Sequence, residues 1–474
     1  MVPTLIWYAT LGLIIWICAK DVKRRDGVSG ATWLVVMWFM INTSRPVSSW
    51  FQGDTQQTVD GYLDGSPLDA TFFFALIFAG LVVLAVRNVQ WSAFISRNRW
   101  MFLFFFYCLV SVVWSDYPFV AFKRWVKDFG NVILLAVLLT EAKPVEAIKA
   151  ALVRCGVILV PLSFALVRYF PEIGRVFAGY NRNEVMYVGV AAHKNTLGAL
   201  LLVSAAALVW DLTSRTGVDP KADRPFRWAR LLILVQAVYL LRMANSATAL
   251  VCTVLFIGIY FAMRLAFVQR RLPRVELYAV VTATLWFTLD STLGLSEMVI
   301  VDLLGRDMDL TTRTEAWDLL LAAQINPLVG AGFKSFWAGE RMVEIWKVLP
   351  NIVQSHNGYV ETYLNGGLIG VVLLAIMLLT GFGRLKRELV QGSEFARVRF
   401  TLWIIVLFYN FSEAAFNQLS LLWCVTLLVI AETPLPVTSE QTAGAPAGAA
   451  AAHRLVPVPH RFVLQRPAHD TVRR

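Results

Sequence analysis

Two of the five histidines lie where a polar segment meets an apolar run, a position suited to acid–base chemistry. These are His193 and His356, whereas the other three fall in the polar C-terminal segment. An imidazole titrates near neutral pH and can accept a proton from a hydroxyl group. A histidine at such a junction is more often only an interfacial hydrogen-bonding residue, so the neighbouring residues must decide between the two interpretations.

The residues that follow His356 predict a helix leading away from it. In QSHNGYVETYLNGGLIGVVLL, the helical period begins just after Asn357, which we expect to lie in the capping turn. Gly366, Gly367 and Gly370 would permit either close helix–helix contact or a bend just below the histidine. His356 is therefore the stronger candidate for a general base.

An arginine and a tryptophan upstream share one face of a predicted helix. Arg313 and Trp317 are four residues apart in an amphipathic segment, so their side chains lie on the same side. The planar donor fork of an arginine suits phosphate oxygens. The alternative is a structural salt bridge from Arg313 to Asp307, Asp309 or Asp318. Lys334 supplies a second cation in the turn that follows.

A further group of basic side chains lies in the segment 167–194 between two apolar runs. Its members are Arg175, Arg182, His193 and Lys194. Cations on the outer side of a membrane run against the usual charge distribution, and an anionic ligand is the simplest reason for them. We therefore expect these residues, with Lys334, to bind an anionic ligand.

No nucleotide-binding or metal-binding motif accompanies these residues. The chain has no P-loop, no H-E-x-x-H, no C-x-x-C and no acidic cluster with metal-ligand spacing. The five cysteines lie in apolar runs and are interpreted as packing residues. We expect metal-free chemistry without a cofactor.

The elements that must position these residues are apolar helices. Of the 474 residues, 57% are hydrophobic and 16% are charged, which is too little polar surface for a soluble globule. Apolar runs of roughly 15 to 22 residues recur, and such lengths can cross a hydrocarbon core of ~30 Å. The composition excludes a soluble enzyme, a disulfide-stapled secreted domain and a disordered scaffold. It predicts an all-α polytopic membrane protein with about thirteen spans, near 4–19, 31–43, 70–86, 100–114, 128–140, 147–166, 195–211, 229–242, 246–263, 275–290, 358–382, 400–412 and 418–432.

The basic residues between these runs predict the orientation. The net charge of +11 suits anionic lipid headgroups between spans, so membrane lipids rather than nucleic acid are the expected partners. Connections on one side, together with the C-terminal tail, hold 28 of the 43 Lys and Arg. The other side holds 14, and Arg154 lies within a predicted span. This places the N-terminus outside, the C-terminus in the cytoplasm, and both candidate histidines outside.

The chain divides into four predicted regions. Residues 1–290 form N-terminal spans with the outer loop 167–194, residues 291–357 form a large outer loop, and residues 358–432 form the C-terminal spans. The remaining residues, 433–474, are of low complexity and are predicted to be a disordered cytoplasmic tail.

Several of these stretches resemble the bacterial O-antigen ligase and polymerase family, which includes exopolysaccharide polymerases. The resemblance covers about residues 100–430. It is carried by VAAHKNTLG at 190–198, RMANSATALV at 242–251, GRDMDLTTRTEAW to GAGFKSFW at 305–337, and HNGYVETYLNGGLIG at 356–370, with SEAAFNQLSLLW at 412–423 similar to the closing outer loop and span. The His-Asn, nine residues, Gly-x-x-Gly pattern matches at every fixed position, including Gly367 and Gly370.

The resemblance implies a C-type inverting glycosyltransferase with its active site on the periplasmic face of the bacterial inner membrane. Such an enzyme moves a glycan from an undecaprenyl-diphosphate carrier to a sugar hydroxyl, and proteins of polysaccharide export or chain-length control are its expected partners. His356 corresponds to the essential histidine of the family and Arg313 to the arginine before its helix. Arg182 is the first choice for the arginine of the earlier loop, with Arg175 or Lys194 as alternatives. The anionic ligand of these cations, of His193 and of Lys334 is then the diphosphate of the carrier.

Three functions remain open from the sequence. The His-Lys-Asn and Thr-Arg-Thr-Glu variants favour a polymerase of repeat units over a ligase that places the glycan on a lipid A core or a protein. A transporter or flippase would place ionisable residues within its spans, and here Arg154 is the clear case.

Overall fold

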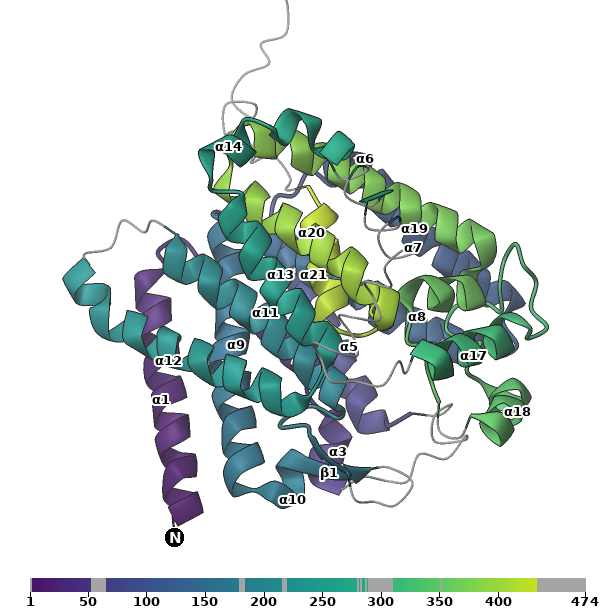
Figure 1. Ribbon diagram of the computed structural model, residues 1–474, viewed down its shortest axis with the longest axis horizontal. Helices are drawn as coiled ribbons and strands as arrows, with labels where there is room; N and C mark the ends of the chain where they lie inside the picture. The colour runs from purple at the N-terminus through teal and green to yellow at the C-terminus, as the bar shows by residue number, and fades with distance from the viewer. Residues whose placement is uncertain are drawn as a thin grey trace, which may run out of the picture. The chain divides into compact units, whose positions relative to one another are not determined.

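A computed structural model describes residues 2–52, 65–178, 184–214, 220–278, 310–349 and 352–432, with single positions at 281, 284, 285 and 288 (Figure 1). These residues belong to one compact unit, Met1–Leu435. Arg182, the predicted tail 433–474 and most of the predicted span at 275–290 lie outside the described residues.

The described chain is built of helices, with one short hairpin. The longer helices are α1 (Val2–Arg24), α2 (Thr32–Thr43), α5 (Pro67–Val86), α7 (Arg99–Val110), α8 (Pro118–Leu139), α9 (Pro144–Tyr169), α11 (Lys194–Thr213), α12 (Pro220–Ala244), α13 (Ala247–Ala262), α17 (Leu310–Leu321), α18 (Gly339–Val348), α19 (Gly358–Val390), α20 (Glu394–Ser412) and α21 (Leu421–Ile430). Shorter helical elements are α3 (Val47–Gln52), α6 (Trp91–Arg97), η1 (Ser111–Trp114), α10 (Pro171–Gly174), α14 (Ala266–Gln269) and η2 (Leu272–Arg274). Strands β1 (Arg175–Ala178) and β2 (Glu184–Tyr187) pair antiparallel, with Arg175 opposite Tyr187.

The predicted all-α polytopic membrane fold is confirmed. Six helices are long and apolar enough to cross a membrane, namely α1, α5, α9, α11, α19 and α20, and shorter apolar helices lie at α2, α7 with η1, α13 and α21. Every predicted span apart from 275–290 coincides with a helix. The first halves of α8 and α12 are charged, which explains why these two are not among the six.

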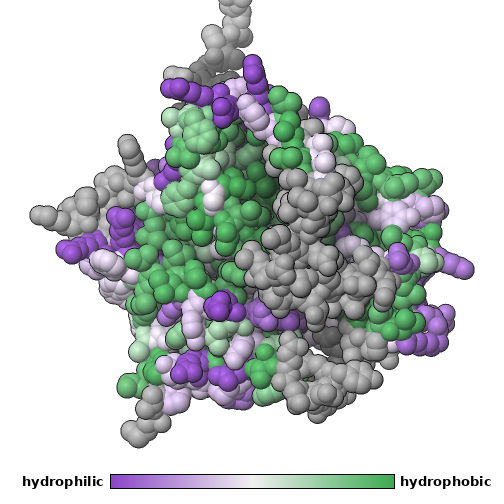
Figure 2. Space-filling view, in the orientation of Figure 1, coloured by the Kyte–Doolittle hydropathy of each residue, from purple (hydrophilic) through white to green (hydrophobic). Residues whose placement is uncertain are grey.

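Exposed apolar side chains mark surfaces that suit lipid. On α5, Phe74, Phe78 and Leu81 are all exposed and recur at helical spacing, so they form one stripe. In Figure 2, hydrophobic side chains cover much of the described middle of the visible face, while hydrophilic ones gather toward its upper edge and lower part. An apolar stripe of this kind is stable against hydrocarbon rather than water.

At one end of the bundle, connections that the charge count assigns to the cytoplasm meet one another. Arg25 donates to Asp21 at 2.7 Å, to Asp211 at 2.8 Å and to Glu146 at 2.9 Å, joining α1, α11 and α9. Arg230 also binds Asp211. Buried charges that are mutually paired hold the helix ends in register.

The ionisable residue predicted within a span, Arg154, is part of this network. Its guanidinium donates to Asp21 at 2.7 Å and to the Thr32 hydroxyl at 2.9 Å, and it lies over the Trp33 ring. A fully partnered arginine has a structural role, so Arg154 does not favour a transport pathway.

A sharp bend in α19 has a precise local cause. Gly367 has φ 60° and ψ −164°, and the segment Pro327–Ala331 packs into the break. Leu368 N donates to Pro327 O at 2.9 Å, and Ala331 N donates to Leu364 O at 3.0 Å. The loop therefore satisfies backbone groups that the broken helix leaves open. Of the two outcomes that the glycine cluster left open, helix–helix contact or a bend, the structure shows the bend at Gly367.

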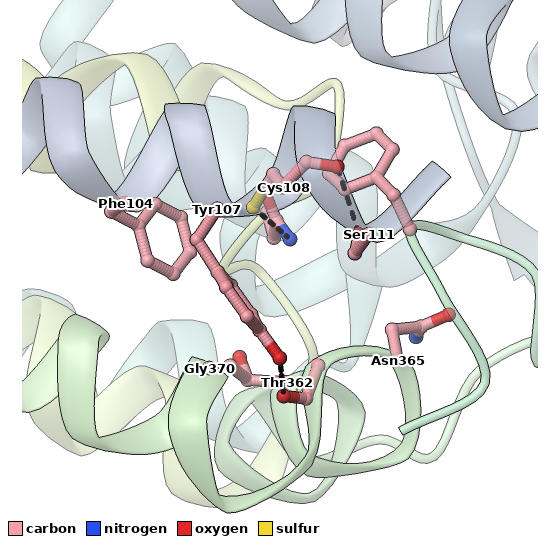
Figure 3. A pocket seen from close by; sticks show the side chains of 10 residues that line it. Phe104, Tyr107, Cys108, Ser111, Thr362, Asn365 and Gly370 are labelled. Carbon is pink, nitrogen blue, oxygen red and sulfur yellow. Dashed lines mark hydrogen bonds between the residues drawn. The ribbon is translucent and has the colours of Figure 1, made fainter. Parts of the chain in front are cut away.

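Helix α7 supports the same bend from its other side. Figure 3 shows Tyr107 reaching from α7 toward α19 beside Thr362 and Gly370. Its hydroxyl donates to Gly366 O at 2.6 Å. The small crevice between these helices holds about 240 Å³ of empty space and is lined mostly by apolar groups. The bend is thus fixed from two sides, and it holds the first turns of α19 against the outer loop.

Candidate active site

His356 lies in a tight turn immediately before α19. Its backbone has φ 52°, a conformation uncommon for a residue with a side chain. Asn357 is the N-cap, and its Oδ1 accepts from Tyr359 N at 2.9 Å and Val360 N at 3.1 Å. The predicted capping turn is therefore present, and the cap fixes the residue next to the histidine.

The turn is held from outside by residues of the large outer loop. Trp317 Nε1 donates to Ser355 O at 2.8 Å, so α17 is attached to the residue before His356. Ser355 N donates to one oxygen of the buried Glu361 at 3.0 Å, and Trp337 Nε1 donates to the other at 2.8 Å. The backbone of this turn is therefore fixed by two side chains, those of Trp317 and Glu361, and Trp337 holds Glu361 in place.

A carboxylate that the sequence analysis did not select contacts the histidine. His356 Nδ1 lies 3.3 Å from Glu413 Oε2, and Asn195 Nδ2 donates to Glu413 Oε1 at 2.7 Å. The Glu413 side chain is 6% exposed and that of His356 is 29% exposed. In the tautomer in which Nδ1–H donates to the carboxylate, Nε2 is left as the proton acceptor.

Glu413 is placed by the end of α20. This helix stops at Ser412, and Asn410 Oδ1 accepts from Ala415 N at 2.9 Å and Phe416 N at 2.7 Å. Gly358 allows the contact between α19 and α20, because a Cβ there would lie 2.1 Å from Asn410 Oδ1. The amide of Asn410 thus fixes the backbone just after Glu413.

His193 caps α11 close to the same carboxylate. Its Nδ1 accepts from Asn195 N at 3.3 Å, so its proton is on Nε2. Burial lowers the pKa of His193, with the charges of His356 and Lys194 acting in the same direction and Glu413 opposing them. His193 is therefore neutral near pH 7 and suited to hydrogen bonding.

His193 and the carboxylate that contacts His356 line a cleft among α2, α11, α20 and α21. It contains about 550 Å³ of empty space, and Glu413, His193 and Asn195 line it. Gln354, two residues before His356, also lines the cleft. Polar groups converge here at one mouth of an otherwise apolar bundle, which is the arrangement expected of a binding site.

Arg313 lies in α17 one turn before Trp317, on the same face of the helix. Its side chain is outside the described residues. The helix that carries Arg313 is therefore attached, through Trp317, to the residue before His356.

The other predicted cations have different surroundings. Lys334 Nζ lies 3.7 Å from the buried Asp128 Oδ1, and burial lowers the pKa of this ammonium group. Arg175 Nε donates to Val167 O at 3.0 Å, and its guanidinium lies over the Tyr187 ring of the hairpin, which was not predicted. Neither Lys334 nor Arg175 lines the cleft. Lys194 begins α11 directly after His193, and it is not among the lining residues of the cleft either.

Replacing Trp317 by phenylalanine tests whether α17 positions the turn. Trp317→Phe removes one hydrogen bond to Ser355 O, worth about 1 kcal/mol, and should lower the transfer rate about fivefold. Trp346→Phe is the matched control, because Trp346 Nε1 also donates to an outer-loop carbonyl, that of Ile352. Equal rates for the two variants in an assay of glycan transfer would contradict a positioning role for Trp317.

Comparison with known proteins shows what the chain is similar to. Residues 229–375, which include Arg313 and His356, match the family described as O-antigen ligase. The chain is 27% identical over 330 residues to the exopolysaccharide production protein ExoQ of Rhizobium meliloti (strain 1021), covering 66% of this chain and 71% of that protein. The protein is a membrane enzyme of polysaccharide or O-antigen synthesis. Both matches confirm the resemblance of this chain to the O-antigen ligase and polymerase family.

Proposed function

We propose that the protein polymerises undecaprenyl-diphosphate-linked oligosaccharide repeat units into a surface polysaccharide at the periplasmic face of the inner membrane. The observation that carries the proposal is the contact between His356 Nδ1 and Glu413 Oε2 beside the cleft, which leaves Nε2 available to a sugar hydroxyl. The C-terminus lies on the cytoplasmic side, as the distribution of basic residues predicts.

The proposed reaction is a single displacement. The acceptor hydroxyl oxygen attacks the anomeric carbon of the donor glycan, the bond from that carbon to the diphosphate oxygen breaks, and the hydroxyl proton moves to His356 Nε2. Attack opposite the leaving group inverts the anomeric configuration. Glu413 stabilises the imidazolium that forms, as a carboxylate does in other histidine dyads. Arg313 stabilises the departing diphosphate, so no metal is required.

A ligase is the second candidate. The matching family is described as O-antigen ligase, and a histidine base would serve a hydroxyl on a lipid A core equally well. The similarity to an exopolysaccharide production protein favours the polymerase. A transporter has less support, because Arg154 is fully paired. Proteins of polysaccharide export or chain-length control are the expected partners of either enzyme.

Purified protein supplied with a lipid-linked repeat unit tests the proposal directly. Without added metal or nucleotide, we expect longer glycans and release of undecaprenyl diphosphate. Transfer that occurs only when a lipid A core acceptor is added would establish the ligase instead. Movement of intact lipid-linked substrate across a proteoliposome membrane, with no change in glycan length, would establish a transporter.

Arg313→Ala should lower the rate of transfer by about 10²–10³-fold, because one preorganised cation at a developing charge contributes about this much. The variant should still insert, since it leaves unchanged Ala316 and Leu320, the side chains of α17 that are buried among those the structure describes. Arg175→Ala is the comparison variant from the earlier loop, 167–194. A full rate in Arg313→Ala, measured as released lipid diphosphate, would remove Arg313 from the mechanism.

A further inference from the structure

A second group of cations lies on the first half of α8, outside the site described above. Lys123, Arg124 and Lys127 fall within five positions, and Arg124 Nη1 donates to the carbonyl oxygen of Lys334 at 2.5 Å. Lys123, Arg124 and Lys334 all act electrostatically on Lys127. We call these four residues the α8 cation group. Like charges this close repel one another unless negative charge compensates them.

Only part of that compensation comes from the described protein. Asp128 pairs with Lys334 at 3.7 Å. Asp69 acts on Lys127, but its two oxygens already accept from Ser48 N at 2.9 Å and Ser48 Oγ at 2.7 Å. Among the described residues, Lys123 and Lys127 therefore have no carboxylate within ion-pair distance. A diphosphate diester carries the complementary charge.

Lys123 and Lys127 are the members placed to take such a ligand. They are four residues apart and share one face of α8. Within the described part of the chain neither forms an ion pair, and each ammonium lies over a ring, that of Lys123 over Phe119 at 5.1 Å and that of Lys127 over Phe73 at 5.5 Å. Two adjacent ammonium groups can each bind one phosphate of a diphosphate.

Aromatic side chains around the α8 cation group place it at the depth of lipid headgroups. Phe119 is 73% exposed and Phe122 is 45% exposed. The Trp125 ring stacks on Phe122 and on Phe129, with ring centroids 6.3 Å and 5.0 Å apart. Exposed aromatics beside basic residues are typical of a membrane–water interface. The ligand is therefore expected to be borne by a lipid rather than to be a free phosphate.

The α8 cation group connects with the cleft through buried polar side chains. Asn42 lines the cleft, and its Nδ2 donates to Asn131 Oδ1 at 3.3 Å. Asn131 Nδ2 in turn donates to Asp128 Oδ1 at 3.1 Å, and the same oxygen faces Lys334. The first half of α8 thus lies at the same end of the bundle as His356, and a lipid bound there can present its glycan to the cleft.

We infer that Lys123 and Lys127 bind the diphosphate of a second lipid-linked substrate, the one whose glycan supplies the acceptor hydroxyl. This inference rests on the proposed function. When both glycans to be joined are attached to lipid diphosphates, two diphosphates must be held at once. Arg313 serves the one that leaves, and the α8 cation group serves the one that stays.

Native mass spectrometry of the full protein in phosphatidylcholine nanodiscs can count bound undecaprenyl diphosphate. We expect two molecules per chain in the wild type and one in K123Q/K127Q, with affinity for the lost molecule at least tenfold weaker. R313A should lose the other molecule. K123R/K127R keeps the charges and should retain both. R168Q/K347Q is the matched control, because it removes two outer-end cations on exposed residues away from α8 and should bind two.

Competing probes distinguish the source of the phosphate. Two molecules retained in K123Q/K127Q would overturn the inference, as would displacement of the second molecule by phosphatidylglycerol or by inorganic pyrophosphate at equal concentration. Loss of binding in K123R/K127R would also overturn it. If wild-type protein binds two molecules and K123Q/K127Q binds one, yet no glycan is transferred, the binding site stands and the proposed function fails.

Discussion

Replacing His356 by alanine should lower the rate of glycan transfer by about 10²–10⁴-fold, which is the usual contribution of a general base. The imidazole is held by the capping turn and by Glu413, so its Nε2 can accept the hydroxyl proton without a rearrangement of the side chain. The protein should still insert and accumulate normally, because His356 is 29% exposed and packs in no apolar cluster. The rate is measured as released undecaprenyl diphosphate from purified protein.

A double-mutant cycle asks whether Glu413 acts through His356. Glu413→Ala alone should also lower the rate of glycan transfer strongly, because the imidazolium formed in the reaction would lack its carboxylate. In a His356→Ala background the second change should add little, since residues that act as a unit are strongly non-additive. Glu413→Gln keeps an acceptor oxygen without the charge and should lose less than Glu413→Ala.

Glu344→Ala is the control for this cycle. Glu344 is an exposed carboxylate of the outer loop, paired with Lys347 on α18, and its loss should leave the rate unchanged. Losses for His356→Ala and Glu413→Ala that multiply in the double variant would show that the two side chains act independently. An unchanged rate in His356→Ala would remove the base from the mechanism.

The features that the sequence predicted depend on local patterns. A span is recognised from the length of its apolar run, which explains why the helices at Pro144–Tyr169 and Lys194–Thr213 match their predicted ranges. The cap at Asn357 and the bend at Gly367 follow from the preferences of single residues in short segments. Each of these features is determined by the few residues that surround it in the sequence.

The features that could not be predicted from the sequence depend on contacts between distant segments. Glu413 is 57 residues from His356, and nothing near it indicates that α20 ends beside α19. Only the SEAAFNQLSLLW stretch, which resembles the closing outer loop of the family, marked that region. The contact of Lys334 with Asp128, about two hundred residues earlier, was likewise not predicted. Pairing partners of buried charges are set by tertiary packing and cannot be assigned from spacing.

The second large effect is expected at the bend in α19, where Gly367→Ala should destabilise the protein by about 4 kcal/mol, or about 10³-fold in the folding equilibrium. The backbone at Gly367, with φ 60° and ψ −164°, is in a region occupied almost only by glycine. An added Cβ would also lie 2.3 Å from the Leu328 carbonyl group. The loop that satisfies the broken helix would have to move away.

Two other glycines of α19 give matched controls. Gly370 belongs to the same Gly-x-x-Gly pattern, but a Cβ there would meet no atom closer than 3.6 Å, so Gly370→Ala should be mild. At Gly383 a Cβ would meet nothing within 4 Å, and Gly383→Ala should be neutral or slightly stabilising. The three variants are compared by folded yield and by thermal unfolding in detergent. Equal stability of Gly367→Ala and Gly370→Ala would show that the positive φ and the contact with Leu328 do not hold the bend, and that the two glycines act alike in helix packing.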